Sequence, residues 1–376
     1  MRILVNMSTL KKGGGQNVGL NFIHCISKVK YSDKVFFYAV VQDSEIHKAL
    51  LALNEKNIVL MPANPLKKLW RELTQGRSIV KENSIDIIYS YFGYGLYPKS
   101  CLQVSGSADS NLFFPEIDFW QHYSGLQLRA KKAIDSFRIW GVKRATAVIF
   151  ENVAMQKRGI ELFGLKNTTF IKPSFSLVES DAQWNLPHAA KNKKVGLFFC
   201  GWQLNKNYEL IPHLAAELKQ RKIDFHFVIT APADNSVEHE AFVQSLRSLN
   251  VESMVSIVGA IKKAEIPSLY RQIHFVFLLS NLESFSNNII EAWQFAKPLM
   301  IANAEWSKAI CNDGACYVER VDKTSIASAL QELIENEASY FALVQKGRTQ
   351  LSAYPSIEER TQQEVEYIEK IYHENR

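Results

Sequence analysis

Short apolar runs alternate with amphipathic stretches along nearly the whole sequence, and this alternation restricts the fold more than any other feature. Runs rich in Val, Ile, Phe and Tyr are typical of strands covered on both faces, and the stretches between them have helical periodicity. Such alternation implies parallel strands in a doubly wound α/β sheet. The predicted strands are residues 2–8, 34–41, 57–61, 85–91, 101–104, 147–150, 195–200, 225–230, 255–258 and 275–279. The predicted helices include residues 18–29, 66–81, 208–221, 236–249, 264–272 and 287–296.

The same pattern occurs twice, which predicts two Rossmann-like domains with a cleft between them. The 376 residues suit two domains of ordinary size. We expect an N-terminal domain over 1–172, a linker over 173–194, a C-terminal domain over 195–350 and a helix within 351–376 that packs on the domain surface. Ligands of such sheets bind at the carboxyl ends of the strands. The residues at those ends are therefore the candidates for function.

Composition and charge narrow the class of protein. The 47% hydrophobic and 22% charged residues exclude disorder and fibrous folds. No apolar run is long enough to span a membrane, and no secretory signal is visible. Five scattered cysteines without a C-x-x-C pair indicate a reducing, cytoplasmic setting. Residues 1–172 carry 24 Lys and Arg against 13 Asp and Glu, which predicts that this half meets an anionic partner, either nucleic acid or membrane phosphate.

Two loops that follow predicted strands have features of phosphate sites. Gly13, Gly14 and Gly15 follow the first strand and precede a helix, so their N–H groups can approach a phosphate closely. The loop is neither a dinucleotide-binding fingerprint nor a P-loop. The second loop reads Gly201-Trp202-Gln203-Leu204-Asn205-Lys206-Asn207. Lys206, just before a helix, can pair with a diphosphate, although each loop alone is also compatible with an ordinary turn.

The stretch from Phe275 to Pro298 is the most informative. A buried strand ends near Ser280, Glu283 follows in the turn, and Glu291 lies eight residues later in a helix. At about 100° per residue, the two carboxylates can point into one cleft at different depths. Glu291 can accept two hydrogen bonds from a vicinal diol such as that of a ribose. The free N–H groups at the helix start can face phosphate or sugar oxygens. The residues at this start are Ser284, Phe285, Ser286 and Asn287, of which all but Phe285 are candidate caps.

Together these motifs resemble glycosyltransferase family 4, the retaining transferases of GT-B fold, and the run Ser110–Pro115 resembles bacterial surface-polysaccharide transferases. The resemblance covers nearly the whole chain and is strongest over 195–303. It implies a nucleotide sugar as donor, UDP-, GDP- or dTDP-linked. In that donor Glu291 would bind the hydroxyls of the ribose. Glu283 would contact the transferred sugar, and Lys206 would neutralise the diphosphate. The other donor-binding residues would be Gly13, Gly14, Gly15, Gly201, Gln203, Gly259, Ile261, Ser284, Phe285, Ser286 and Asn287.

The reaction implied by the resemblance is transfer of the sugar, with retention and without a metal or other cofactor, to a glycan or lipid-linked saccharide. Such a reaction serves synthesis of O-antigen, capsule or lipopolysaccharide. Two departures from the family are visible. Trp202 stands where the family has Arg, and no His occurs in the loop after residue 104. Ser107 and Asp109 of that loop are instead predicted to line the sugar or acceptor site.

Alternative functions remain open from the residues alone. A sugar-nucleotide 2-epimerase or a phosphorylase would have the same fold, and a non-catalytic nucleotide-sugar-binding subunit would explain the missing Arg and His. A nucleic-acid binder is disfavoured because no helix-turn-helix, zinc or RNP pattern is present. Metal-dependent transfer would need a D-x-D motif at a strand end. A hydrolase would use Glu283 and Glu291 as flanking carboxylates.

The basic stretch 123–144 predicts a membrane-surface helix. It contains Arg129, Lys131 and Lys132 among aromatic residues, a combination that can lie at the headgroup level of an anionic bilayer. A solvated face over an aromatic core is the alternative. We therefore expect a cytoplasmic protein that can associate peripherally with the inner face of the cytoplasmic membrane.

Overall fold

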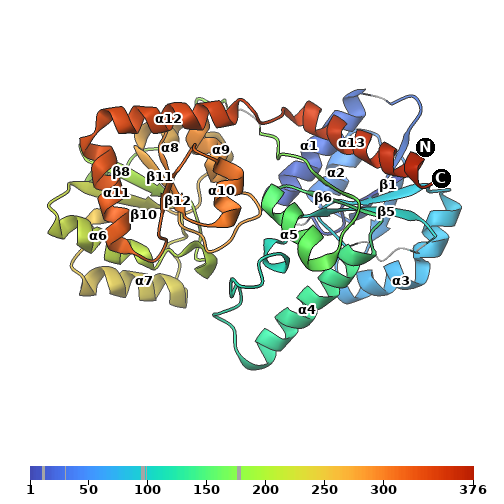
Figure 1. The fold of residues 1–376 in the computed structure, drawn as a ribbon, viewed down its shortest axis with the longest axis horizontal. Coiled ribbons are helices and arrows are strands. Elements are labelled where there is room, and N and C mark those ends of the chain that lie inside the picture. Colours follow the sequence, from blue (N-terminus) through green and yellow to red (C-terminus); the bar gives the residue numbers. More distant parts are fainter. Residues whose placement is uncertain (11–12, 30, 95–97, 99, 176–178) are drawn as a thin grey trace. The chain divides into compact units, whose positions relative to one another are not determined.

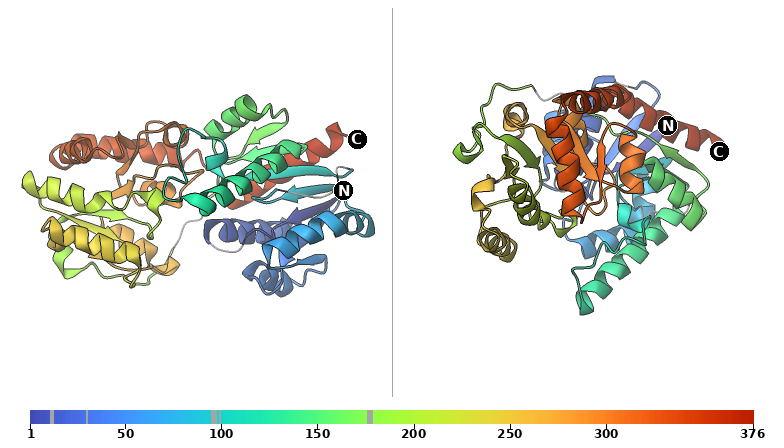
Figure 2. Two further views of the ribbon diagram at one scale, coloured as in Figure 1. Left: turned by 90° about the horizontal axis from the view of Figure 1, so that it is seen from below. Right: turned by 60° about the vertical axis from the view of Figure 1, so that its left-hand side comes forward.

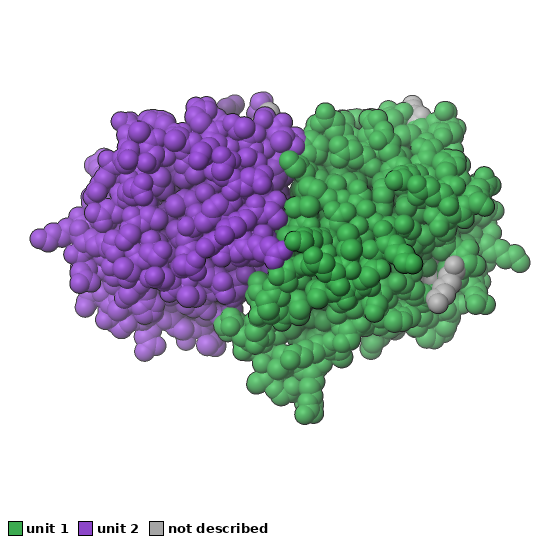
Figure 3. Space-filling view, in the orientation of Figure 1, with its two compact units in different colours: residues 1–174, 355–376 green, residues 175–354 purple. Residues whose placement is uncertain are grey.

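The computed structural model describes residues 1–10, 13–29, 31–94, 98, 100–175 and 179–376. The chain forms two compact units, Met1–Ser174 with Pro355–Arg376 and Phe175–Tyr354 (Figure 3). Each unit is one parallel sheet with helices on both faces (Figures 1 and 2). This confirms the predicted fold class. Residues 176–178 of the predicted linker lie outside the described residues.

The first unit has a seven-stranded sheet of order β3-β2-β1-β4-β5-β6-β7, and all its pairs are parallel. Its strands are β1 (Arg2–Asn6), β2 (Val35–Val41), β3 (Ile58–Met61), β4 (Ile87–Ser90), β5 (Leu102–Ser107), β6 (Ala147–Phe150) and β7 (Thr168–Phe170). Its helices are α1 (Gly13–Val29), α2 (Glu45–Ala52), α3 (Pro65–Glu82), α4 (Gly125–Arg144), α5 (Val153–Phe163) and α13 (Ile357–Glu374).

Each face of this sheet has its own apolar core. The larger core joins side chains of β1, β2 and β4 to α1 and α13, through residues such as Phe22 and Ile368. The core on the opposite face includes Leu4, Phe37 and Ile79, the last from α3. The C-terminal helix α13 therefore completes the first unit, although the chain has passed through the second unit before reaching it.

The second unit has a six-stranded parallel sheet of order β10-β9-β8-β11-β12-β13. Its strands are β8 (Lys194–Phe198), β9 (Phe225–Ile229), β10 (Val255–Ile257), β11 (Phe275–Leu278), β12 (Leu299–Ala302) and β13 (Cys316–Val318). Its helices are α6 (Leu210–Gln220), α7 (Val237–Ser248), α8 (Ile266–Gln272), α9 (Asn287–Gln294), α10 (Glu305–Cys311), α11 (Lys323–Glu335) and α12 (Glu337–Leu351).

A glycine in β8 allows the aromatic core of this unit to close. A Cβ on Gly196 would lie 2.5 Å from the ring of Phe277 and 2.7 Å from that of Phe225. Phe277 also stacks on Phe198 at a centroid distance of 5.0 Å. Any larger residue at position 196 would push these rings apart.

Every predicted strand is present, with ends that differ by three residues or fewer. One local expectation is corrected, because Gly13, Gly14 and Gly15 form the first turn of α1 and not a loop before it. The short strands β7 and β13 and the helices α2, α5, α10, α11 and α12 were not predicted.

Both sheets reverse their strand order at one point. In the first unit the reversal lies between β1 and β4, and in the second between β8 and β11. In parallel sheets in general, ligands bind at the carboxyl ends of the strands beside such a reversal. The β8–β11 reversal places the loop containing Lys206 next to the turn containing Glu283.

Candidate functional site

The carboxyl ends of β8 and β11 hold the two residues predicted to be catalytic. The Nζ of Lys206 lies 2.5 Å from Oε1 of Glu283. Both side chains are mostly buried, with 21% and 14% of their surface exposed. Because the pair is shielded from bulk water, its charges interact more strongly than they would on an open surface. The structure thus brings together two groups that are 77 residues apart in sequence.

Asparagine side chains hold the two loops in this arrangement. The Nδ2 of Asn207 donates to the carbonyl oxygen of Leu279 at 2.7 Å and to Oδ1 of Asn281 at 2.9 Å. Asn205 donates through its side chain to the carbonyl of Leu282 at 2.9 Å, and its own carbonyl accepts from the N–H of Asn281 at 2.8 Å. These bonds flank Lys206 on both sides along the chain, so the lysine is directed at the β11 turn.

Asn281 is the centre of this network. It is 7% exposed. Its Oδ1 also accepts from Nε of Arg320 at 2.8 Å, and its carbonyl accepts from Nε1 of Trp306 at 3.2 Å. The three asparagines and Arg320 were not assigned site roles from the sequence. The sequence does show several asparagines shortly after buried strands, and side-chain amides at such positions can form hydrogen bonds with loop carbonyls.

Glu291 lies within α9, and its environment is defined by one tyrosine. The hydroxyl of Tyr270, from α8, donates to Oε2 of Glu291 at 2.9 Å. The Tyr270 ring has no exposed surface and stacks on Phe295 at 5.1 Å. Burial raises the pKa of the Glu291 carboxyl, and the tyrosine bond opposes this shift. One carboxylate oxygen is thereby fixed by the protein. Tyr270 was not predicted as a site residue.

The start of α9 provides backbone donors beside these carboxylates. Ser286 is the N-cap residue, but its side chain makes no capping hydrogen bond. Asn287, the first helical residue, is exposed. Phe285 packs against the ring of Tyr354 at 5.9 Å and therefore helps to hold the turn. Ser284 lies between Glu283 and this cap, so the four predicted residues form one continuous segment.

The remaining donor-site predictions of the second unit lie in two loops. Gly259 and Ile261 follow β10, and Gly259 has φ +76°, which favours glycine. Gly201 and Gln203 lie in the β8–α6 loop, where a Cβ on Gly201 would meet only the Gln203 side chain, at 3.5 Å. Gly201 is therefore not required by backbone strain or by crowding with more distant residues.

Trp202 has a packing role at the position where the resemblance leads one to expect Arg. Its Nε1 donates to the carbonyl of Pro232 at 2.8 Å. Its ring lies 5.0 Å from that of Tyr208 and 5.3 Å from that of Phe242. The indole thus joins the loops after β8 and β9 and contributes no positive charge. This leaves Lys206 as the cation of the loop.

Predicted residues of the first unit lie at the carboxyl ends of its own strands. Ser107 ends β5 and is 1% exposed. Burial raises the pKa of Asp109, and Arg138 lies 3.2 Å from its carboxylate. Lys131 in α4 lies over the rings of Trp120 and Tyr123, at 4.7 and 4.9 Å. Arg129 and Lys132 are exposed, as are Gly13 and Gly14 at the start of α1, whereas Gly15 is half-buried.

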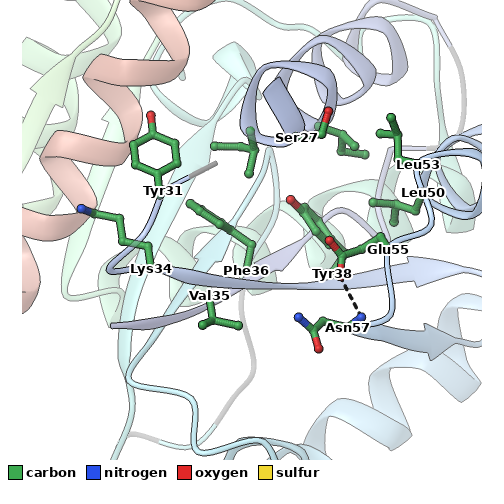
Figure 4. A pocket seen from close by; sticks show the side chains of 12 residues that line it. Ser27, Tyr31, Lys34, Val35, Phe36, Tyr38, Leu50, Leu53, Glu55 and Asn57 are labelled. Carbon is green, nitrogen blue, oxygen red and sulfur yellow. Dashed lines mark hydrogen bonds between the residues drawn. The ribbon is translucent and has the colours of Figure 1, made fainter. Parts of the chain in front are cut away.

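A cavity of about 310 Å³ in the first unit contains none of the predicted site residues (Figure 4). It lies between α1, α2 and β2, and its lining includes Tyr31, Lys34, Tyr38 and Glu55. Its cation is already neutralised, since Lys34 pairs with Asp33 at 2.8 Å and Glu369 at 3.2 Å. We assign it no role in the predicted chemistry.

Within the part of the chain that the structure describes, no three His, Cys, Asp or Glu side chains gather as a metal site would require. No helix among the described residues is both long and apolar enough to cross a bilayer.

The comparison with protein families is informative for the second unit. Residues 185–350 match the family model for glycosyl transferases group 1. This segment contains Lys206, Glu283, Glu291 and the asparagine network. No curated protein matches the chain significantly by sequence.

Solved structures establish the fold of both units. Sucrose-phosphate synthase from Thermosynechococcus elongatus has a TM-score of 0.73 at 14% identity, covering 99% of both chains. Anabaena Alr3699/HepE in complex with UDP-glucose has a TM-score of 0.70 at 17% identity, covering 98% of this chain and 100% of that one. A UDP-N-acetylglucosamine 2-epimerase described as putative, from Listeria monocytogenes, has a TM-score of 0.61 at 11% identity, covering 99% and 97%. The chain has the GT-B fold.

Proposed function

We propose that the protein is a glycosyltransferase that takes its sugar from a nucleoside-diphosphate sugar. The observation that carries this proposal is the Lys206–Glu283 pair at the strand-order reversal, beside α9 with Glu291. A cation, an uncapped helix start and a carboxylate held on one oxygen are the groups that a diphosphate and a ribose diol require. The family match over 185–350 and the UDP-glucose bound by HepE support the same donor class.

In this proposal each group has a separate role. Glu291 accepts hydrogen bonds from the ribose hydroxyls with the oxygen that Tyr270 leaves available. Lys206 keeps its bond to Glu283 with one N–H and donates the others to the diphosphate, since an ammonium has three donors. Glu283 is then placed to accept from a hydroxyl of the sugar. The N–H groups at the start of α9 stabilise charge on the departing diphosphate.

The proposed reaction proceeds with retention. The acceptor hydroxyl oxygen forms a bond to the anomeric carbon on the face from which the diphosphate departs. The bond between that carbon and the diphosphate oxygen breaks, and the acceptor proton passes to the departing phosphate. Positive charge from Lys206 makes the diphosphate a better leaving group, so no metal ion is invoked. The acceptor is a glycan or a lipid-linked saccharide of bacterial surface-polysaccharide assembly, reached from the cytoplasm.

A screen of UDP-, GDP- and dTDP-linked sugars by thermal shift, followed by calorimetry, tests the donor. We expect one class to bind, and Glu291→Gln to weaken its binding about tenfold or more, since charge-assisted hydrogen bonds contribute about 1.5–3 kcal/mol. NMR of the product then reports whether the anomeric configuration is retained. Equal affinity of Glu291→Gln and the parent protein for the donor would contradict the ribose assignment.

A sugar-nucleotide 2-epimerase is the second candidate, because a putative enzyme of that class shares the fold. Incubation without an acceptor separates the two functions. An epimerase changes the sugar of the nucleotide sugar with no acceptor present, whereas a transferase requires the acceptor hydroxyl. Donor binding with neither reaction would favour a non-catalytic subunit.

A further inference from the structure

Two helices of the first unit expose more large apolar side chains than a solvated surface needs. On α3, Leu66, Trp70 and Leu73 are 76%, 62% and 58% exposed. They are spaced i, i+4 and i+7, so they form one stripe. The residues that α3 buries, Glu72, Gly76 and Ile79, lie on a different side of the helix. The helix is thus apolar on a side that packs against nothing in its unit.

A second exposed stripe lies on α4. Leu126, Phe137 and Trp140 are 81%, 40% and 46% exposed, and their spacing of eleven and fourteen residues places them on one side. The helix buries only Gly141 and Val142, both in its last turn. The preceding turns bury no residue fully, and α4 forms the lower edge of its unit in the view of Figure 3. Both α3 and α4 lie on the sheet face opposite to α1 and α13 (Figures 1 and 2).

The charge around these stripes has one sign. The two helices carry eleven Lys and Arg but only three acidic residues. Of these three, Glu72 is buried, and Asp135 accepts hydrogen bonds from Trp120 at 2.6 Å and Asn111 at 2.8 Å. Only Glu82 is exposed. Two exposed tryptophans among so many basic groups match the headgroup region of an anionic bilayer, where the indole rings enter and the cations pair with phosphates.

We propose that α3 and α4 together form a docking surface for an anionic lipid bilayer. The sequence indicated only the basic stretch of α4, whereas the structure adds α3 and identifies Trp70 and Trp140 as the inserting side chains. Arg129 and Lys132 supply the attraction, because both are exposed, while Lys131 is already engaged with its own aromatic rings. Vesicle binding itself needs no nucleotide sugar. Only the further step, that the surface delivers a membrane-borne acceptor, rests on the proposed glycosyl transfer.

Co-sedimentation with phosphatidylcholine vesicles, with and without phosphatidylglycerol, tests the surface at low and high salt. We expect binding only with phosphatidylglycerol and weaker binding in salt. Arg129→Ser with Lys132→Ser should weaken it about fivefold for each charge removed. The matched control is Lys48→Ser with Lys370→Ser, whose side chains are both 62% exposed on α2 and α13. This control should bind like the parent protein.

Insertion of the indoles is tested separately. Trp70→Ser with Trp140→Ser should weaken binding on the order of tenfold or more, because buried apolar surface is lost. The control, Val237→Ser with Phe341→Ser, removes side chains that are 79% and 55% exposed in the second unit. It should change nothing. Brominated lipids should quench tryptophan fluorescence of the parent protein, and Trp70→Phe with Trp140→Phe should remove the quenched component.

Four results would overturn the proposal. In the first two, the protein stays in the supernatant with anionic vesicles at low salt, or it binds neutral and anionic vesicles equally. In the third, the protein sediments without vesicles because it self-associates. In the fourth, it binds anionic vesicles but the tryptophan substitutions do not weaken this binding. The last result would indicate a general polyanion surface, and binding of duplex RNA would then be expected. If vesicle binding fails while transfer to a soluble acceptor persists, only the docking surface is wrong. If vesicles bind but no nucleotide sugar does, the proposed function is wrong instead.

Discussion

Replacing Tyr270 with Phe removes a single hydroxyl next to Glu291. The ring would keep its stack on Phe295, so the change is small in volume. The hydroxyl that is lost donates to Oε2 of Glu291 at 2.9 Å. Without it, the carboxylate is free to turn, and its raised pKa rises further because the bond that opposed the shift is gone. The Glu291 carboxylate, our proposed ribose acceptor, then becomes less ordered and holds its proton to a higher pH.

The size of the effect follows from the bond. A hydrogen bond to a charged group contributes about 1.5–3 kcal/mol, and positioning accounts for part of that. If the donor screen selects a UDP-linked sugar, we therefore expect UDP to bind about fivefold to tenfold more weakly to Tyr270→Phe than to the parent protein. The loss should grow as pH falls, since a carboxylate with a raised pKa is protonated at higher pH than an ordinary one.

Calorimetry with UDP and with 2′,3′-dideoxy-UDP separates positioning from packing. A positioning role predicts that the variant loses affinity for UDP but little for the dideoxy nucleotide, which has no diol for Glu291 to hold. Tyr340→Phe is the matched control. This substitution also removes one hydroxyl in the second unit, which donates to the carbonyl of His274 at 3.2 Å. His274 directly precedes β11, so this hydroxyl lies at the amino ends of the strands, away from the candidate site at their carboxyl ends. Equal losses for both nucleotides in Tyr270→Phe would refute the reasoning.

Three further predictions concern charge and pH. In calorimetry, Lys206→Gln should weaken UDP binding about tenfold or more and leave uridine binding nearly unchanged, because only the diphosphate can pair with the ammonium. Equal losses of affinity for UDP and for uridine would contradict the proposed role of Lys206. Transfer should survive EDTA in an endpoint assay, and loss of turnover that Mg²⁺ restores would count against Lys206 as the sole cation. Burial lowers the pKa of His226 from 6.5 to about 4. Between these two values the unfolded chain binds a proton that the folded protein does not, so the free energy of unfolding should be highest above pH 6.5 and fall toward pH 4. The expected decrease at pH 5 is roughly 1 kcal/mol or more. His226→Gln should flatten the dependence of Tm on pH, and an unchanged slope would exclude His226 as its source.

The sequence predicted the fold because both sheets depend on a pattern with many repeats. Strands such as β6 and β11 are four consecutive buried residues, and β11 also lies between two predicted helices. Lys206, Glu283 and Glu291 became candidates for a related reason. They stand at fixed distances from those strands, and the carboxyl edge of a parallel sheet brings such positions together.

The support of the site could not be predicted in the same way. Asn205, Asn207 and Asn281 act through hydrogen bonds between two loops, and a sequence does not show which carbonyls lack partners. Tyr270 precedes Glu291 by 21 residues and approaches it only because α8 and α9 pack in one unit. A buried tyrosine in an apolar helix is ordinarily interpreted as core packing, which it also provides.

The C-terminal helix shows where charge patterning misleads. The sequence has charges on most faces of this stretch and predicts a helix that packs on the domain surface, yet Arg360 and Glu364 of α13 are themselves 3% and 1% exposed. Arg360 donates to Glu151, directly after β6, at 2.8 Å and to Glu364 at 3.0 Å. Tyr91, directly after β4, donates to the same Glu364 oxygen at 3.1 Å.

A buried cluster of this kind contributes little net stability compared with apolar packing, but removing one partner costs about 3–5 kcal/mol. We infer that its effect is to select one register of α13 against the carboxyl ends of β4 and β6. A helix shifted by one turn would leave Glu151 buried without Arg360. Because the chain returns to the first unit at Pro355, after the whole second unit, this cluster determines where the last segment docks. Apolar contacts from residues such as Ile368 provide the area, and the charges provide the register.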